Sequence, residues 1–322
     1  MMNILTRSGK FIALFACILL LTVSVFPQLS LRKALDKDAD GKADLTIFRP
    51  SNNVWYYLNS AGFVIQQFGL ANSDYPAPGD YDGDGKGDIA VWRDSDGVWY
   101  RLNSSDNTFA ATAFGTTGDE PIARDYDGDG KTDLAVVRRT NGAMIWYVLR
   151  SSDGGFIASQ FGVSTDFTAP GDYDGDGQFD FAIQRPGATA ADQATFFIQR
   201  SSDSGFTITQ FGLSNDLVVP GDYDGDGKTD IAVVREGQAN VPNNLIWFIL
   251  RSSDGGFVAN TFGLIASDLN VQNDYDGDGK TDIAVWRDTD GSFYILRSSD
   301  GVLNVIQWGA ASDFPVASYD TH

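Results

Sequence analysis

The sequence has almost none of the residues on which thiol and histidine-assisted nucleophilic chemistry depends. It contains one cysteine, Cys17, and one histidine, His322, and glutamate is scarce. A nucleophile usually needs an adjacent base such as histidine, so a Ser-His or Cys-His pair is not expected in this chain. Cys17 lies in a segment predicted to leave with a signal peptide, and the mature chain is therefore predicted to lack disulfides and thiol chemistry.

Long segments with an apolar period of 3.6 residues are also missing, which argues against amphipathic helices. Glycine is abundant at 35 residues, and short apolar runs alternate with turn residues. Apolar residues make up 43% and aromatic residues 13% of the 322-residue chain, enough for a sizeable core. The composition favours an all-β fold and argues against disorder.

Basic residues are few: 23 lysines and arginines face 43 acidic residues, a net charge of −20. Such a polyanion repels nucleic acid and anionic lipid, so neither is an expected partner. The acidic residues are clustered, because 24 of the 43 fall in six short loops. These loops need a cation.

The N-terminus has the layout of a signal peptide. Arg7 and Lys10 precede an apolar run over residues 11–26, which is shorter than the roughly 20 residues of a membrane span. We predict a signal peptide over residues 1–30; an uncleaved anchor extending to Leu31 is the alternative. The residues before Cys17 only faintly resemble a lipoprotein cleavage box, because the apolar run continues beyond it. The protein is therefore expected to be secreted, extracellular or at the cell surface, with a periplasmic location as a further option, and its mature domain is not expected to insert into a membrane.

A repeat of 44 to 52 residues organises the rest of the chain. Each unit has an Asp-rich loop, an apolar strand ending in arginine (residues 89–93), an aromatic strand (99–102), a Ser-Ser-Asp-Gly turn (151–154) and a strand ending in Phe-Gly (160–162). Four short strands per unit at this period predict a β-propeller. Stacking of the blades would bury the tryptophans as structural residues.

Six loops, six aromatic strands and one spare C-terminal strand predict six four-stranded blades, with the last strand closing the ring. The domain would span residues 31–322. The expected blades are 31–69, 70–115, 116–162, 163–212, 213–263 and 264–309, and the closing strand is 310–322.

Every loop reads Asp-x-Asp-x-Asp-Gly-x-x-Asp, a pattern typical of a calcium site. Calcium takes six to eight hard oxygen ligands, and the glycine at position six permits a sharp turn. Position seven would offer its backbone carbonyl, and the ninth-position Asp could bind through both oxygens. The predicted ligands are Asp36, Asp38, Asp40, Lys42 and Asp44; Asp80, Asp82, Asp84, Lys86 and Asp88; Asp125, Asp127, Asp129, Lys131 and Asp133; Asp172, Asp174, Asp176, Gln178 and Asp180; Asp222, Asp224, Asp226, Lys228 and Asp230; and Asp274, Asp276, Asp278, Lys280 and Asp282.

The main competing interpretation of the loops is a helical EF-hand. That motif needs a glutamate at position twelve, where this chain has Ile or Val within an expected strand. Magnesium suits the loops less well than calcium, because it prefers to retain water. About six calcium ions would bring the net charge from −20 to −8.

The loop and its following strand resemble the calcium-binding FG-GAP/VCBS repeat of integrin α-subunit propellers and bacterial surface proteins. The resemblance covers residues 31–322 and implies calcium in the hairpin between the first and second strands of each blade. Unlike integrins, this chain has a loop in every blade, so an integrin-like ligand is not implied.

The expected function is binding or adhesion at the cell exterior by a monomer, with a glycan or protein as ligand and no catalysis. The alternatives are a polysaccharide lyase or glycosidase on a propeller scaffold, and a purely structural surface module. The long turns near residues 140–143, 186–194 and 236–244 would build the binding surface, since variable loops on a rigid scaffold commonly carry function; tolerated drift is the alternative. The strand-end arginines would pair with carboxylates as struts between blades, or contact a ligand instead. They are Arg49, Arg93, Arg138, Arg185, Arg235 and Arg287.

Overall fold

The computed structural model describes residues 34–71, 73–238 and 241–316, and these residues form strands and turns without a helix. The predicted signal peptide lies outside the described residues. Within the described part of the chain, no helix is long and apolar enough to cross a membrane. The strands make six four-stranded antiparallel sheets, as the repeat predicts.

Each sheet is one blade, with its shortest strand innermost and the others following outward in order. Blade one comprises β24 (Phe314–Pro315), β1 (Leu45–Arg49), β2 (Val54–Asn59) and β3 (Gly62–Gln67). Blade two comprises β4 (Asp74–Pro76), β5 (Ile89–Arg93), β6 (Val98–Leu102) and β7 (Phe109–Ala113). Blade three comprises β8 (Glu120–Pro121), β9 (Leu134–Thr140), β10 (Ala143–Leu149) and β11 (Phe156–Val163).

The other three blades repeat this order. Blade four comprises β12 (Phe167–Thr168), β13 (Phe181–Arg185), β14 (Gln193–Gln199) and β15 (Phe206–Leu213). Blade five comprises β16 (Leu217–Val218), β17 (Ile231–Gln238), β18 (Val241–Leu250) and β19 (Phe257–Leu264). Blade six comprises β20 (Asp268–Asn270), β21 (Ile283–Arg287), β22 (Ser292–Leu296) and β23 (Leu303–Gln307).

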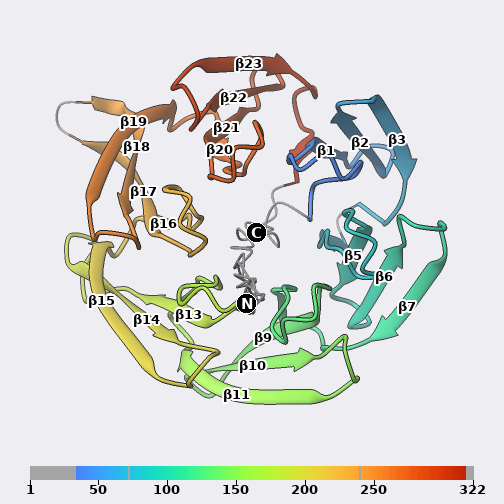
Figure 1. The fold of residues 1–322 in the computed structure, drawn as a ribbon, viewed down its shortest axis with the longest axis horizontal. Helices are drawn as coiled ribbons and strands as arrows, with labels where there is room; N and C mark the ends of the chain where they lie inside the picture. Colours follow the sequence, from blue (N-terminus) through green and yellow to red (C-terminus); the bar gives the residue numbers. More distant parts are fainter. Residues whose placement is uncertain (1–33, 72, 239–240, 317–322) are drawn as a thin grey trace, which may run out of the picture.

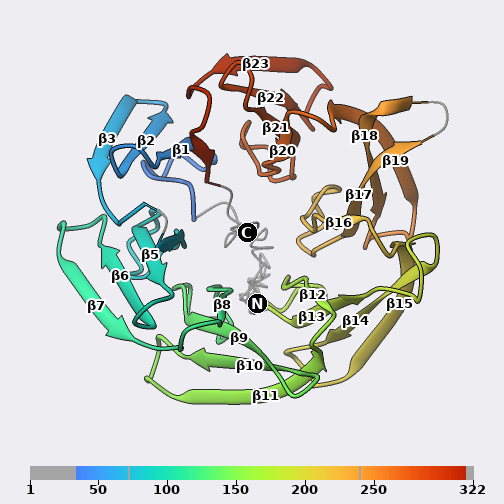
Figure 2. The ribbon, with the colours of Figure 1, turned by 180° about the vertical axis from the view of Figure 1, so that it is seen from behind.

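The blades follow one another around a central axis, with the short first strands innermost and β3, β7, β11, β15, β19 and β23 on the rim (Figures 1 and 2). The ring closes through β24, which pairs antiparallel with β1 in the register Phe48↔Phe314. The C-terminal strand thus supplies the inner edge of blade one, and the prediction of six blades closed by this strand is confirmed.

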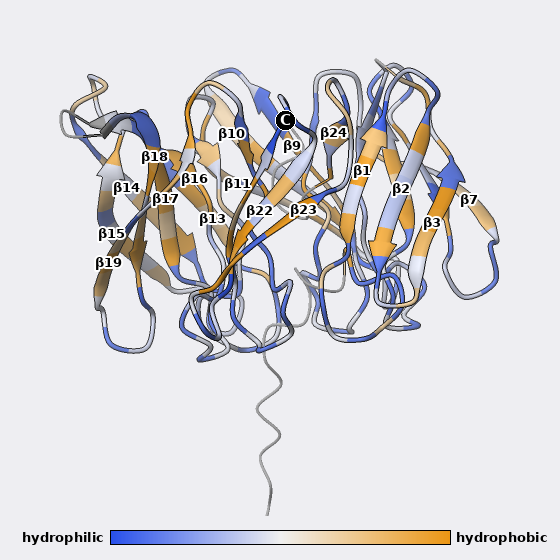
Figure 3. Ribbon diagram, turned by 90° about the horizontal axis from the view of Figure 1, so that it is seen from above, coloured by the Kyte–Doolittle hydropathy of each residue, from blue (hydrophilic) through white to orange (hydrophobic). Residues whose placement is uncertain are grey.

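The strands run across the disc and place the turns on two opposite faces (Figure 3). Because neighbouring strands are antiparallel, the first-to-second and third-to-fourth turns share one face, which carries the Asp-rich loops. The second-to-third turns and the inter-blade linkers share the other face. Gly118 of a linker, for example, donates its N–H to Asp94 in the second-to-third turn of blade two at 2.6 Å.

The core lies between blades rather than within them. Trp146 of blade three packs with Ile183 of blade four in one apolar cluster, and Trp92 of blade two packs with Val136 of blade three in another. Equivalent clusters fill the other four interfaces. Six tryptophans are fully buried there: Trp55, Trp92, Trp99, Trp146, Trp247 and Trp286. Their structural role follows from the need of each sheet to cover its faces.

Every strand-end arginine binds an aspartate in or next to the inner strand of its own blade. Arg93 at the end of β5 donates to both oxygens of Asp74 on β4, at 2.6 and 2.9 Å, and its guanidinium lies over the ring of Tyr100 on β6. The prediction of arginine–carboxylate pairs is confirmed, but their placement between blades is wrong, because both partners belong to one blade. The six pairs are Arg49–Asp313, Arg93–Asp74, Arg138–Asp119, Arg185–Asp166, Arg235–Asp216 and Arg287–Asp268.

Candidate metal centres

In blades two to six, each Asp-rich loop connects the first and second strands of its blade, whereas in blade one the loop directly precedes β1 and the first strand, β24, comes from the C-terminal end. In blade two, the backbones of Gly79 and Asp88 pair as an isolated antiparallel bridge that pins the two ends of the loop together. Gly83 and Gly85 both adopt positive φ, 83° and 87°, a conformation that costs glycine little. The chain therefore winds tightly between the first and last aspartates.

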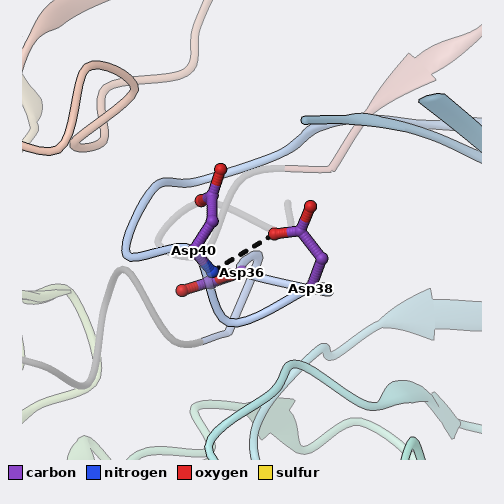
Figure 4. Close-up of side chains that lie close together, drawn as sticks. All are labelled: Asp36, Asp38 and Asp40. Atoms are coloured by element: carbon purple, nitrogen blue, oxygen red, sulfur yellow. Dashed lines mark hydrogen bonds between the residues drawn. The ribbon is translucent and has the colours of Figure 1, made fainter. Parts of the chain in front are cut away.

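This winding brings carboxylates from alternate positions to one point. In five loops, one oxygen from each of three aspartates lies within 4.8 Å of the others. Those groups are Asp36, Asp38 and Asp40; Asp80, Asp82 and Asp88; Asp125, Asp127 and Asp133; Asp172, Asp174 and Asp180; and Asp222, Asp224 and Asp230. Figure 4 shows the first group, where the Asp40 N–H donates to Asp38 Oδ1 at 3.2 Å.

Backbone amides orient the first and last aspartates. Asp80 accepts hydrogen bonds from the N–H groups of Gly83 and Gly85 at 2.7 and 3.0 Å. Asp88 accepts from the N–H of Tyr81 at 2.8 Å. Both aspartates are almost completely buried, with 2% and 1% exposure. The carboxylates are thus fixed by the fold before any ligand arrives.

The third aspartate of several loops makes contacts that the sequence did not predict. Asp84 accepts hydrogen bonds from the Lys86 N–H at 2.9 Å and the Ser104 hydroxyl at 3.0 Å. In blades two to five, the third aspartates (Asp84, Asp129, Asp176 and Asp226) do not belong to the converging groups of three. The ligand role of the position-seven carbonyls, at Lys42, Lys86, Lys131, Gln178, Lys228 and Lys280, stays a prediction.

The Ser-Ser turns are part of the centres, which sequence reasoning did not anticipate. Ser104 donates its N–H to Asp88 at 2.6 Å, and the Ser105 hydroxyl donates to Asp82 at 2.6 Å. The same contacts recur in blade three, where Ser151 and Ser152 bind Asp133 and Asp127. The signal was present in the sequence, because the Ser-Ser-Asp turn recurs in the same phase as the loops.

Blade one departs from the pattern. Its second loop residue is Lys37, where the other loops have Tyr81, Tyr126, Tyr173, Tyr223 and Tyr275. The Lys37 Nζ donates to the Gly87 carbonyl at 2.9 Å, and its ammonium lies over the ring of Tyr57. Burial lowers the pKa of Lys37, against the attraction of several aspartates led by Asp88. A cation of the protein therefore lies between the first two loops.

The six loops form a closed circle of hydrogen bonds around the axis. One residue of each loop donates its N–H to the carbonyl of the first aspartate of the preceding loop, at 2.6 to 2.8 Å. The donor–acceptor pairs are Gly87–Asp36, Thr132–Asp80, Phe179–Asp125, Thr229–Asp172, Thr281–Asp222 and Ala43–Asp274. A change in one loop is therefore transmitted directly to its neighbour.

Burial makes several first and last aspartates of the loops reluctant to ionise in the metal-free protein. Desolvation is the largest effect; it raises the pKa of Asp44 to about 8 and that of Asp172 to about 7. Backbone hydrogen bonds oppose the shift, and neighbouring carboxylates add to it. Asp133 and Asp282 have pKa values raised to about 6 by the same causes. The fold thus gathers negative charge at a free-energy cost.

This cost predicts opposite effects of pH on the metal-free and calcium-loaded protein. A carboxyl whose pKa is raised on folding favours the folded state when protonated, so metal-depleted protein should gain stability as the pH falls from about 8 toward 5. With calcium, protons compete for the same oxygens, and the stabilisation by calcium should shrink below about pH 6 to 7.

The measurement is the melting temperature of metal-depleted and calcium-saturated protein at pH 8 and pH 5.5. The gap between the two forms should narrow at least twofold at the lower pH. A gap that stays the same would mean that the buried aspartates do not take part in binding.

The donor set suits calcium. All of the gathered atoms are carboxylate oxygens, the hard ligands that calcium prefers, and the described part of the loops places no histidine or cysteine among them. Two like charges about 4 Å apart repel by about 4 kcal/mol at an effective dielectric of 20. A divalent cation would remove this repulsion and use the orientation that the amides already impose.

The long second-to-third turns lie on the face opposite the metal centres. In blade three, β9 and β10 extend to a tight turn in which Thr140 pairs with Ala143. In blade five, β17 and β18 extend to the pair Gln238↔Val241. Each long turn is followed by a register shift in the pairing with the rim strand. The sequence-based separation of loops and long turns onto two faces agrees with this topology.

Comparison with known proteins gives the same repeat and the same fold. A family model described as an FG-GAP-like repeat matches residues 36–91 and 125–183. Both matches begin at the first aspartate of a loop and end in the strand after the following loop. No curated protein sequence matches the chain.

Several solved structures are similar over most of their length. A triple-arginine mutant of AofleA from Arthrobotrys oligospora has a TM-score of 0.53 at 11% identity, covering 90% of this chain and 97% of that one. A functionally unknown protein from Desulfotomaculum acetoxidans DSM 771 has a TM-score of 0.49 at 13% identity, covering 83% and 81%. The Dos1 propeller has a TM-score of 0.39 at 10% identity, covering 84% and 74%. At 11% identity, the likeness to the AofleA mutant concerns the fold alone.

Proposed function

Because the chain is a β-propeller built of FG-GAP-like repeats, we propose that it is an exported calcium-binding module that binds a glycan or protein ligand and catalyses no reaction. The observation that carries the calcium part is the convergence of three aspartate oxygens within 4.8 Å in one loop after another. Calcium would hold the loop face closed while the opposite face presents the variable turns.

The binding part rests on the asymmetry between the two faces. One face repeats the same loop six times, and backbone hydrogen bonds on this face join each loop to the next. The other face carries turns of different length in blades three to five. In a repeat structure with a common scaffold, the parts that vary on one face often form the binding face.

The non-catalytic part rests on the chemistry of the side chains. The aspartates that lie close together are those of the loops and the arginine pairs, where each has a structural partner. His322 is the only histidine of the chain. A general base near a reactive nucleophile is the usual requirement for hydrolysis.

Ligand capture in the presence and absence of calcium tests this proposal. The calcium-loaded protein should bind immobilised glycans or capture a protein in a pull-down, and binding should fall at least tenfold after metal depletion. Binding in neither assay would leave a structural module as the better description. Turnover of uronic-acid polysaccharides by the purified protein would support an enzyme instead.

A further inference from the structure

The propeller contains a cavity on its axis, bordered by the inner strands of blades three to five. It has a volume of about 670 Å³ and is lined by the inner strands β8, β12 and β16 and by residues next to the strand-end arginines. Ligand pockets of small molecules usually measure about 300 to 1,000 Å³. The cavity is therefore large enough for a small organic ligand.

The residues of this cavity break the repeat. The position after the aspartate that binds the strand-end arginine holds an aromatic residue or leucine in five blades (Tyr75, Phe167, Leu217, Leu269 and Phe314), but Glu120 in blade three. The position after the strand-end arginine holds Arg139 in blade three and Glu236 in blade five, where the other blades have proline or aspartate. Glu120 and Glu236 are the only glutamates of the chain, and both line the cavity. Since four other blades fold without them, the scaffold does not require these residues.

Glu120 and Arg139 form a fixed polar wall. The guanidinium of Arg139 donates to Glu120 at 2.9 Å, and it donates to the carbonyls of Ser164 and Asp166 at 3.0 and 2.5 Å. The Thr168 hydroxyl donates to the other oxygen of Glu120 at 2.9 Å. These bonds join blades three and four across the cavity wall and orient the carboxylate.

Glu236 supplies a second polar group on the blade-five side. Its side chain is exposed, and it makes no hydrogen bond or ion pair with the residues that the structure describes. Between the two polar groups lie Phe167 and Leu217, which are 50% and 48% exposed although they are on inner strands. The wall thus alternates carboxylates with exposed apolar surfaces.

The charges of the lining cancel. Asp216 is neutralised by Arg235 at 2.7 Å, which leaves Glu120 and Glu236 against Arg124 and Arg139. A charged ligand would gain no net attraction there. A neutral ligand with many hydroxyl groups would satisfy the carboxylates and arginines by hydrogen bonds, and its apolar face could stack on the ring of Phe167.

We propose that the axial cavity of blades three to five binds a neutral saccharide of one to three residues. Glu120 and Glu236 would accept hydrogen bonds from sugar hydroxyls, and Phe167 would contact a face of a pyranose ring. This inference rests on the proposed binding function and places it on the axis rather than at the tips of the long turns.

The test is titration of the calcium-loaded full-length protein, by calorimetry and ligand-observed NMR, with glucose, galactose, mannose, N-acetylglucosamine, lactose and cellobiose. Glucuronate and glucosamine serve as charged counterparts. At least one neutral sugar should bind, and its charged counterpart should bind at least tenfold more weakly. Phe167→Ala and Glu236→Gln should each weaken binding at least tenfold.

Leu269→Ala is the matched control. Leu269 occupies the position of Phe167 on the inner strand of blade six and is 46% exposed, but it does not line the cavity. Its replacement should leave sugar binding unchanged. The melting temperature of each variant with calcium should stay within about 3 °C of the parent, since exposed residues contribute little to stability.

Three outcomes would overturn the inference. If neutral sugars bind but Phe167→Ala and Glu236→Gln do not weaken them, the saccharide site lies elsewhere and the binding function stands. If a protein partner is captured and no neutral sugar binds, the ligand class is wrong. If neither sugar nor protein binds, the proposed function fails together with the inference.

Discussion

Removal of calcium is expected to lower the melting temperature of the protein by more than about 15 °C. At free calcium ten times the dissociation constant, one site adds about 1.4 kcal/mol to the free energy of unfolding, and six sites add about 8 kcal/mol. For a domain of this size, 1 kcal/mol corresponds to about 2 to 4 °C. The closed circle of hydrogen bonds between Thr132 and Asp80 and their equivalents should make the loss cooperative.

The measurement is thermal unfolding of the protein in millimolar calcium and in excess EGTA at pH 8. Asp133→Asn is the matched variant, because Asp133 is fully buried and belongs to a single loop. It should remove about one equivalent from a calorimetric calcium titration and reduce the effect of EGTA by at least about a sixth, since the loops are joined to one another. Magnesium at the same concentration should replace calcium poorly. Identical melting with calcium and with EGTA would refute calcium as the stabilising ligand.

Loss of the closing strand is expected to have the second large effect. A chain that ends at Gly309 lacks β24, so the edge of β1 at Ile47 and Phe48 is left unpaired. It also loses Val316, which is 2% exposed in the cluster between blades one and two. The melting temperature should fall by more than about 10 °C. An unpaired strand edge promotes association between chains, so gel filtration should show oligomers.

A matched pair of point variants distinguishes the effect of opening the ring from the effect of losing one arginine–aspartate pair. Asp313→Ala removes the partner of Arg49, 264 residues away in the sequence, whereas Asp166→Ala removes the partner of Arg185, only 19 residues away. Both leave an arginine without its buried carboxylate, at a cost of about 1 to 3 kcal/mol. Asp313→Ala should in addition raise the rate of unfolding, because it weakens the contact between β24 and β1 at which the ring closes. Equal unfolding rates for the two variants would show that the closing contact between β24 and β1 is no weaker than the equivalent contacts in the other blades.

The repeat in the sequence was sufficient to predict the propeller, since its period and its four short apolar runs leave few other architectures. It also predicted the number of blades, because Asp313–Val316 repeats the residues that precede each loop. The clustering of aspartates was expected from the same pattern of alternate carboxylates with a glycine at position six, although the third aspartates of blades two to five lie outside the converging groups. These features depend on the spacing of residues that are close together in the chain, and that spacing can be read directly from the sequence.

The partners of the strand-end arginines were harder to predict. Arginine was expected to join neighbouring blades, but Arg93 binds Asp74 within its sheet. The signal was available, because an aspartate stands six residues before the first loop aspartate in five repeats: Asp74, Asp119, Asp166, Asp216 and Asp268. In blade one that position is Ser30, and Asp313 from the other end of the chain replaces it. The pairing of Arg49 with Asp313 can be explained only once the C-terminal strand is known to close the ring.

The sequence by itself determined the all-β class, the repeated blade and the acidic loops, because each depends on residues near one another in the chain. It also identified the closing strand, because residues 313–316 repeat the segment that precedes each loop. The tertiary structure decided which distant groups meet, both within a blade and across blades. It placed Ser105 against Asp82, joined the loops in a circle, and brought Glu120 and Glu236, 116 positions apart, to one axial cavity. Contacts of this kind depend on the curvature of the ring and on how each blade sits against the next. No local pattern encodes that arrangement.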